Sequence, residues 1–307
     1  MPKIPSIPRL SIIVPLGTND AAFEETLVSV LANRPAGCEI LVVHDGTYSD
    51  PFNISDEVRF VVSDNNTLIS LIASGAKAAR ARFTHILAPG FCAVEDWTDP
   101  AMAKFESHDA AVVVPVVCRP ENGRIVAAGW GDTSYRLCQP IAEGASTVAR
   151  QDIASLTGAY LQASFWRREV LQSLVLAFDA PTVGDATYAY GHLVAQAGWR
   201  CVLAEESILT TTTKTSEWDK SSYKRGRHYR AIRKAITLRD KTMPLLINLL
   251  RGVFRPSSVA ETLGQASFRS KMASTKRRLQ FDQVVQYVDH SVIPMTTHQS
   301  VPQRRAA

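Results

Sequence analysis

The stretch "RLSIIVPLGTNDAAFEETLVSVLANRP", Arg9–Pro35, joins one strand signal to one helix signal. Its first part is a run rich in β-branched residues, which Pro15 and Gly17 bring to an end. Apolar residues then recur at the spacing of a helix face, at Phe23, Leu27, Val30 and Leu31. We therefore predict a strand followed by a helix, which is one β-α unit.

The same alternation continues through the first half of the chain. Further strand signals fall at Cys38–Gly46, Val58–Asn66, Thr84–Leu87 and Ala110–Cys118. Helix signals separate them over Thr67–Phe83 and from about Glu95 to Glu106. Near-continuous apolar strands separated by helices are typical of a mostly parallel sheet that is covered on both faces.

From about Arg119 the pattern becomes mixed. We predict a hairpin within Glu121–Asp132, a strand and a helix within Gly158–Leu174, and a helix that ends near Gly198 before a closing strand. The predicted fold class is therefore α/β, with a mixed, mostly parallel sheet flanked by helices.

Length and composition bound the class of protein. With 307 residues and 46% apolar residues, the chain can bury a sizeable core. No run approaches the ~18 apolar residues of a membrane-spanning helix, and the start "MPKIPSIPRL" lacks the apolar segment of a secretory signal, so we predict a cytoplasmic protein. The five cysteines are scattered and never form a C-x-x-C pair, which argues against a disulfide framework and a zinc site.

The charge is distributed unevenly. Residues 214–307 carry 19 Lys and Arg against 6 Asp and Glu, a net charge of +13, whereas residues 1–213 carry 15 against 23, a net charge of −8. We therefore predict two regions, a body over 1–213 and a basic helical extension over 214–307 whose last residues, from about Pro294, are disordered.

From Leu10 to about Arg255 the chain resembles the family 2 glycosyltransferases, which have the nucleotide-diphospho-sugar-binding GT-A fold. "LSIIVPLGTND" resembles the opening strand and Val-Pro loop of that family, and "EILVVHDGTYSD" resembles its second strand, which ends in Asp-Asp-Gly-Ser. "TGAYLQASFWRREV" and "AFDAPTVGDATYAYGHLVAQAGWR" resemble its acceptor half. The resemblance implies a GT-A nucleotide-diphospho-sugar transferase-like domain over 1–213.

The resemblance also implies a metal site that this chain does not support. The family's fourth strand ends in Asp-x-Asp, whose carboxylates hold Mg²⁺ or Mn²⁺ against the diphosphate, but the matching positions here are Ala88 and Gly90. Hard cations need oxygen ligands, so we predict no metal-ligating residue and no cofactor. Two other positions that serve the diphosphate in the family also differ: Ile72-Ala73 replaces Arg-Asn, and Thr211–Thr213 replaces a His.

The nucleotide crevice is expected where the first, second and fourth strands end. By resemblance, Pro15 belongs to the Val-Pro loop, His44 stands at a uracil-contacting position, and Asp45 keeps one acid of the Asp-Asp-Gly motif. Together with Ala88 and Gly90 they are the expected nucleotide-binding positions. Each polar residue also has a simpler interpretation, since Asp45 fits an Asx turn and a lone His44 fits a packed side chain.

Asp185 stands at the place of the catalytic base, which removes the proton of an acceptor hydroxyl in an inverting transfer. Gly184 replaces the Glu that precedes this Asp in the family. An Asp just ahead of a helix is also an ordinary N-cap, and we favour that interpretation because a base without an activated donor has no task. We likewise interpret Glu95 and Asp96 as acids at a helix start rather than as replacement metal ligands.

Two helices are predicted in the basic region. Tyr229, Ile232 and Ile236 form the apolar stripe of the first, for which we favour packing on the body. The second, Met243–Phe254, has one apolar face, and the choice stays open between packing and peripheral contact with an anionic membrane, at the inner face of the cell membrane. Nucleic acid is disfavoured as a partner because no binding module accompanies the charge.

Two functions follow from these observations. The first is a glycosyltransferase-like protein that moves a sugar from a nucleotide-sugar to an unknown acceptor, with weak or absent metal-dependent activity. The second is a GT-A-fold pseudoenzyme that serves as a binding or assembly partner. The loss of several groups that serve the diphosphate keeps the second in play, because stabilising the charge of the leaving group is usually the largest catalytic contribution.

Overall fold

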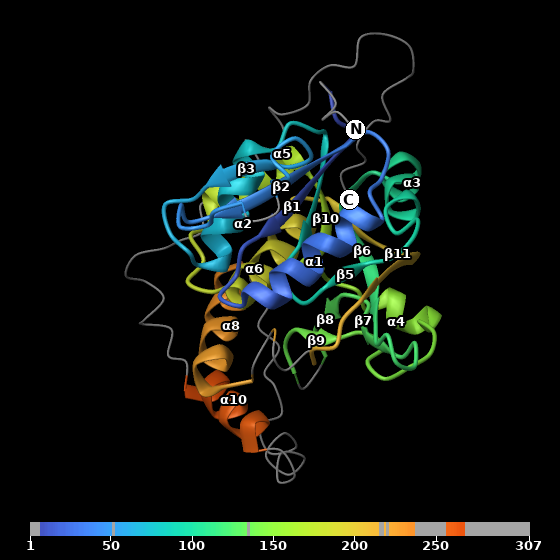
Figure 1. Ribbon diagram of the computed structural model, residues 1–307. Coiled ribbons are helices and arrows are strands. Elements are labelled where there is room, and N and C mark those ends of the chain that lie inside the picture. The colour runs from blue at the N-terminus through green and yellow to red at the C-terminus, as the bar shows by residue number, and fades with distance from the viewer. Residues whose placement is uncertain are drawn as a thin grey trace.

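The structure is a computed structural model that describes residues 7–50, 53–133, 136–214, 218, 221–236 and 256–267. A nine-stranded sheet runs through the described part of the body, with helices on both faces (Figure 1). The strands are β1 Leu10–Pro15, β2 Cys38–His44, β3 Arg59–Val62, β4 Phe83–Leu87, β5 Cys92–Ala93, β6 Ala110–Cys118, β7 Ile125–Ala127, β8 Trp130–Gly131, β9 Gln139–Pro140, β10 Ala163–Arg167 and β11 Arg200–Thr210. The helices are α1 Asp20–Ala32, α2 Leu68–Ala78, α3 Asp99–Ser107, α4 Arg150–Ala154, α5 Arg168–Ala177, α6 Val183–Gln196, α8 Tyr223–Ile236 and α10 Pro256–Ser267.

The strand order is β3-β2-β1-β4-β10-β6-β11-β5, with β7 paired to β6. The pairs β1-β2, β1-β4, β2-β3 and β6-β11 are parallel, while β10 runs antiparallel to both β4 and β6. The α/β class and the mixed, mostly parallel sheet predicted from the sequence are confirmed. The hairpin predicted within Glu121–Asp132 lies partly elsewhere: β7 falls in this range, but it pairs antiparallel with β6, which ends at Cys118.

The sheet separates two apolar cores because alternate residues of each buried strand face opposite sides. Ile13 and Val43 face the side covered by α2, α5 and α6. Ile12 and Val42 face the side covered by α1 and α3. Every residue of β1, β2 and β4 is buried, which explains why the sequences of these strands are nearly continuous apolar runs.

One buried carboxylate joins the first four strands at their amino-terminal ends. Glu39 of β2 is 1% exposed, and its Oε1 accepts hydrogen bonds from the Ser11 hydroxyl at 2.6 Å and the Arg80 amide at 2.7 Å. The Arg59 guanidinium of β3 lies 3.4 Å from Oε2. Because a buried charge is tolerated only when it is paired and hydrogen-bonded, these contacts fix β1, β2, β3 and the segment before β4 together.

Close packing around Trp130 joins the second half of the body to α6. The ring is fully buried, and its Nε1 donates to the Ala159 carbonyl at 3.1 Å. A Cβ at Gly191 would lie 2.5 Å from this ring, and one at Gly158 would lie 2.7 Å from it. Only glycine therefore allows α6 and the segment around Gly158, ahead of β10, to approach the indole this closely.

Helices α8 and α10 lie against one another below the body (Figure 1). Tyr229 and Ile232 of α8 are buried, so the packing predicted for this helix is confirmed for these two positions. Helix α6 has a left-handed Gly198 just after its end, as the sequence predicted. The second predicted tail helix, Met243–Phe254, and the end from Pro294 lie outside the described residues.

All five cysteines are free thiols, of which Cys38 and Cys138 are buried. In the described part of the chain, no helix combines the length and the apolar character needed to cross a membrane.

A buried histidine in β4 gives the fold a testable pH dependence. His85 is fully buried between Trp97 and Phe165, and among the described residues no group meets the distance and angle of a hydrogen bond to either ring nitrogen. Burial lowers the pKa of His85 well below its usual value, and the nearby Ser164 backbone raises that pKa by less. The ring therefore stays neutral in the folded state under mildly acidic conditions.

We expect His85→Leu to make stability less dependent on pH. Below about pH 6.5 the unfolded chain binds a proton that the buried ring does not, which lowers the free energy of unfolding by about 1.4 kcal/mol per pH unit. Urea unfolding between pH 7 and pH 5 measures this loss, and the variant should lack it. His108→Gln, at a partly exposed histidine, should keep the wild-type slope; an equal slope in His85→Leu would contradict the assignment.

Candidate functional site

A crevice opens where the parallel strands β1 and β4 end, which is where ligands bind in open α/β sheets. Its volume is about 360 Å³, within the range of small-molecule sites. Gly17 and Pro89 both line it and lie close together, since a Cβ at Gly17 would lie 3.1 Å from the Pro89 ring. The polar side chains of the lining are neutral: Thr18, Asn19, Asn66, Gln162 and Thr213.

Two helices begin at this crevice. Asn19 caps α1 by accepting the Ala22 amide, and Thr67 caps α2 by accepting the Ser70 amide. Residues from both first turns line the cavity. The positive ends of two helix dipoles therefore face the crevice, an arrangement that favours an anion.

Of the predicted nucleotide positions, Ala88 and Gly90 lie in the crevice wall. The Ala88 amide donates to the Gln162 carbonyl at 2.8 Å, and the Gly90 amide donates to the Thr26 hydroxyl at 3.0 Å. Thr211 Oγ1 donates to the Gly90 carbonyl at 2.6 Å. Gly90 has a φ of +88°, a conformation that favours glycine, so this turn is built around a residue that cannot ligate through a side chain.

The residues present do not fit a carboxylate-bound divalent cation. Ala88 and Gly90 provide no side-chain oxygen, and the nearby Thr211 and Thr213 hydroxyls hydrogen-bond to each other at 2.8 Å. Throughout the residues that the structure describes, no three His, Cys, Asp or Glu side chains gather closely enough to hold a metal ion. Glu95 and Asp96 lie in exposed turns ahead of α3, which begins only at Asp99, so the helix start predicted at Glu95 is wrong by four residues.

The other predicted nucleotide positions lie beside the crevice and do not line it. Pro15 is buried at the end of β1, opposite Val43. His44 is 7% exposed, packs against Tyr48 and Phe60, and accepts the Gly46 amide on Nδ1 at 3.1 Å. The geometry therefore gives His44 the contacts of a packed side chain.

Asp45 forms an Asx turn at the end of β2. Its Oδ1 accepts hydrogen bonds from the Thr47 hydroxyl at 2.6 Å and from the Thr47 amide at 3.1 Å. These bonds stabilise the charged form and hold the pKa of Asp45 below its ordinary value. The carboxylate is thus oriented by its own loop.

Asp185 lies in the first turn of α6. The sequence favoured it as the N-cap, but the N-cap is Thr182, whose hydroxyl accepts the Asp185 amide at 3.1 Å and donates to Asp185 Oδ2 at 2.9 Å. His228 of α8 lies 3.1 Å from the same oxygen through its Nδ1. The Asp185 side chain is only 3% exposed, whereas that of His228 is 31% exposed.

A second cavity of about 270 Å³ surrounds this pair. It is lined by Thr182, Val183, Gly184, Asp185, Trp218, Ser222, Lys224, Arg225, His228 and Tyr229. Val183 and Trp218 also line the crevice at the strand ends, so the two cavities adjoin. Asp185 and His228 therefore lie next to the place where a crevice-bound ligand would end.

Trp218 forms the partition between the two cavities. Its Nε1 donates to Thr213 Oγ1 at 2.6 Å, and its ring packs against Phe91 and Tyr160 at centroid distances of 4.7 and 5.6 Å. Gln162 Nε2 donates to the Trp218 carbonyl at 3.4 Å. The buried Gln162 Oε1 has no hydrogen-bond partner among the described residues and is available to a ligand donor.

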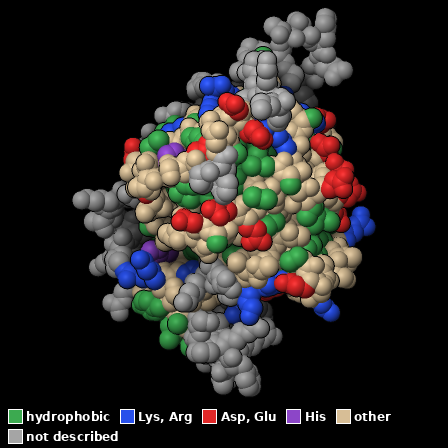
Figure 2. Space-filling model, in the orientation of Figure 1, with side chains coloured by type: hydrophobic (Ala, Val, Ile, Leu, Met, Phe, Trp, Pro, Cys, Tyr) green, Lys and Arg blue, Asp and Glu red, His purple; other side chains and the backbone are tan. Residues whose placement is uncertain are grey.

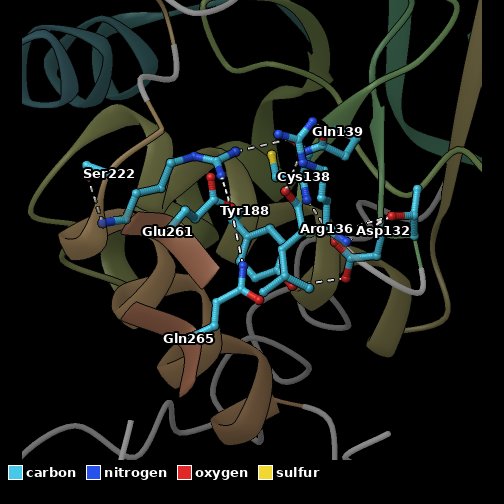
Figure 3. A network of polar contacts seen from close by, with 11 residues as sticks. Asp132, Arg136, Cys138, Gln139, Tyr188, Ser222, Glu261 and Gln265 are labelled. Atoms are coloured by element: carbon cyan, nitrogen blue, oxygen red, sulfur yellow. Dashed lines mark hydrogen bonds and ion pairs between the residues drawn. The ribbon is translucent and has the colours of Figure 1, made fainter. Parts of the chain in front are cut away.

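A polar network holds α8 and α10 in place (Figure 3). Arg225 Nη1 lies 2.5 Å from Glu261 Oε1, its Nη2 donates to the Cys138 carbonyl at 3.2 Å, and its guanidinium lies 4.3 Å from the Tyr229 ring centroid. Glu261 also accepts from Gln265. The buried Arg225 side chain therefore holds α8 against α10 and against the segment at Cys138.

The same network continues to a buried carboxylate, Asp132. Tyr188 donates to its Oδ2 at 2.9 Å, the Cys138 amide donates to its Oδ1 at 2.9 Å, and His192 lies 3.3 Å from Oδ2. Burial raises the pKa of Asp132, but His192, the Cys138 amide and Arg233 together outweigh burial, so the pKa lies below its ordinary value. Burial, and after it Asp132, hold the pKa of Tyr188 well above its usual range.

Charge on the surface follows the division seen in the sequence. Acidic side chains are scattered over the middle of the face in Figure 2, while a cluster of Lys and Arg lies at its lower left, over α8. The cavity beside Asp185 is lined by cations of this helix, Lys224 and Arg225. Sequence reasoning assigned α8 to packing and did not predict that it reaches the site.

Comparisons with known proteins identify the fold. No protein-family model and no curated protein sequence matches the chain. A mannosyltransferase from Pyrobaculum calidifontis, solved with GDP-mannose and Mn²⁺, is similar over 94% of this chain and 87% of its own, with 14% identity and a TM-score of 0.50. GalNAc-T7, solved with UDP, GalNAc and Mn²⁺, is similar over 94% of this chain and 58% of its own, with 13% identity and a TM-score of 0.54.

The chain thus spans little more than half of the GalNAc-T7 chain that it matches. At these identities the likeness shows the fold alone. The fold is that of the GT-A glycosyltransferases, a mixed, mostly parallel sheet flanked by helices, as the sequence predicted.

We expect Thr47→Val to raise the pKa of Asp45 toward its ordinary value, because the variant removes the shorter of the two hydrogen bonds to Oδ1. An NMR titration of the Asp45 carboxyl carbon measures this change. Thr47→Ser keeps the hydroxyl and should keep the lowered pKa. If both variants behave alike, the hydroxyl does not orient the carboxylate.

Proposed function

We propose that this GT-A-fold protein binds a nucleotide-diphospho-sugar in the crevice at the ends of β1 and β4 and transfers the sugar to a hydroxyl acceptor. As a more specific proposal, it is a divergent member of family 2 that lacks the Asp-x-Asp metal motif. The observation that carries the proposal is the junction of two cavities. The crevice meets the cavity that contains Asp185, the residue at the place of the catalytic base.

The two cavities differ in a way that suits the two substrates. The crevice has neutral hydrogen-bonding groups and the first turns of α1 and α2, which suit a diphosphate and its sugar. The cavity around Asp185 contains a carboxylate and is partly open to solvent. These properties suit the acceptor hydroxyl, which must lose a proton. The complex of one structural neighbour with GDP-mannose, and that of the other with UDP and GalNAc, support the same assignment of the crevice.

Charge stabilisation in this proposal comes from the chain itself. Both structural neighbours were solved with Mn²⁺, but Ala88 and Gly90 give this chain no carboxylate to hold such an ion. The positive ends of the two helices and the exposed Lys224 would stabilise a departing diphosphate. Each contributes less than a bound divalent ion, so we propose slow, metal-independent transfer.

A second function is favoured by one observation. The turn at Ala88–Gly90 is closed by Thr26, Gln162 and Thr211 through its own backbone groups, so it is built as a structural turn. A protein that kept the crevice but lost its charge-stabilising groups would act as a binding or assembly partner. Under that proposal it would bind a nucleoside diphosphate without turnover.

The basic region enters as a separate proposal. We keep 1–213 as the transferase-like body and 214–307 as its basic extension, with α8 packed on α6. The extension would contact an anionic membrane peripherally, because this region carries a net charge of +13. The protein would then lie in the cytoplasm, at the inner face of that membrane.

We expect calorimetry to detect binding of uridine or guanosine diphosphate with the same affinity in EDTA and in millimolar Mn²⁺. The reason is that no carboxylate pair links the ion to the protein. Binding that requires Mn²⁺ would contradict the proposed site. A Gly17→Val variant, whose side chain would meet Pro89 in the crevice, should weaken binding in both conditions.

We expect Asp185→Asn to reduce transfer by roughly 10²- to 10⁴-fold while nucleotide affinity stays unchanged, since the variant keeps the shape but loses the carboxylate charge that supports removal of the acceptor proton. Release of nucleoside diphosphate from a uridine or guanosine diphosphate sugar, with a panel of sugar acceptors, measures the rate. Asp152→Asn in α4 is the matched control and should be silent. Binding without any turnover in the wild-type chain would instead support the second function.

A further inference from the structure

The pair formed by Asp185 and His228 has an unequal exposure. Asp185 is the buried partner, with 3% of its side chain exposed, and His228 is the partly exposed one, with 31%. Both line the cavity next to the crevice. An acceptor hydroxyl entering this cavity would therefore reach the imidazole more readily than the carboxylate.

The hydrogen bond fixes the chemical state of the ring. Asp185 Oδ2 already accepts from the Thr182 hydroxyl at 2.9 Å, and the ionised carboxylate has only acceptors to offer to His228 Nδ1 at 3.1 Å. Nδ1 must therefore carry the proton. In a neutral imidazole this leaves the lone pair on Nε2, which is the nitrogen that can accept a proton.

The groups around His228 agree with that role. Asp185 faces it from α6, and Lys224 and Arg225 face the same cavity from α8. Arg225 is bound to Glu261 of α10, so it neutralises a buried carboxylate and leaves Asp185 to His228. Helix α8 is held by the stack of Tyr229 on Tyr188, which fixes the position of the histidine one residue earlier.

We propose that His228 is the general base of the transfer and that Asp185 is its positioning residue. The inference rests on the proposed function and deepens it. The acceptor oxygen attacks the anomeric carbon, its proton passes to His228 Nε2, and the bond from the anomeric carbon to the phosphate oxygen breaks with its electron pair leaving on the nucleoside diphosphate. Asp185 holds the Nδ1–H tautomer and stabilises the imidazolium that forms.

The activity test uses His228→Ala in the full-length protein. We expect the transfer rate to fall by roughly 10²- to 10⁴-fold with unchanged nucleotide affinity, and free imidazole to restore part of the rate, because the small molecule can occupy the vacated space and accept the proton. Imidazole should not rescue Asp185→Asn, and His108→Ala, just after α3, should be silent. A His228→Ala rate within threefold of wild type, or a large loss without rescue, would overturn the proposal.

A second test does not depend on turnover. In ¹⁵N-edited NMR spectra of the wild-type protein, His228 should be in the Nδ1–H form, and Asp185→Asn should change that tautomer. His228→Gln, with near wild-type thermal stability, identifies the resonance and shows that the fold tolerates the change. An Nε2–H form in the wild type would overturn the dyad, whereas the predicted tautomer with no turnover would overturn the proposed function and the base role together.

Discussion

The candidate site depends on the contact between α6 and α8. Tyr188 and Tyr229 stack with their ring centroids 4.4 Å apart and their planes 7° apart, and the Arg225–Glu261 pair closes the other side of α8. An aromatic pair contributes about 0.5–1.5 kcal/mol beyond its buried area, while breaking a buried ion pair costs about 3–5 kcal/mol. The ion pair joins α8 to α10, whereas the stack and the hydrogen bond from Arg225 to the Cys138 carbonyl join α8 to the body and place His228 beside Asp185.

The chemistry of the crevice follows from what ends each strand. In this fold a strand end can present a carboxylate, but β4 ends in Ala88, Pro89 and Gly90, whose polar groups are all backbone. Thr26 and Thr211 form hydrogen bonds with the Gly90 amide and carbonyl, so these backbone groups are already paired and are not offered to a metal ion. The cationic residues near the site come instead from α8, which lies after the last strand of the sheet, whereas Asp185 comes from α6, so the acidic body and the basic extension meet at one place.

Signals within short stretches of sequence were sufficient to locate several strands of the sheet. β-Branched runs and helical spacing depend on residues within one element, so the predicted strands near β1, β2, β4 and β6 lie where expected, as does the end of α6. The helix start was placed at Glu95 rather than Asp99, because acids in a turn look like acids in a first helical turn. The same ambiguity made Asp185 look like a cap, although Thr182 three residues earlier has that role.

The site was less predictable, because it is made by contacts between distant segments. The hydrogen bond from His228 to Asp185 joins residues 43 positions apart, and no periodicity within α8 distinguishes His228 from the solvated charges beside it. The basic composition of 214–307 suggested a surface role, whereas Trp218 and His228 face the two cavities. The apolar stripe that contains Tyr229 was the useful signal in this helix, and it correctly predicted that α8 packs against the body.

The position of α8 after β11 also sets an order of events at the ribosome. Protein synthesis adds about 5–20 residues per second, so the 43 residues from Asp185 to His228 take about 2–9 s to synthesise. The last strand along the chain, β11, is synthesised within this interval, so every strand of the sheet is present in the nascent chain only shortly before His228 is added. All strands of the sheet are thus synthesised before the histidine, so the dyad can be completed only after translation has passed beyond the sheet.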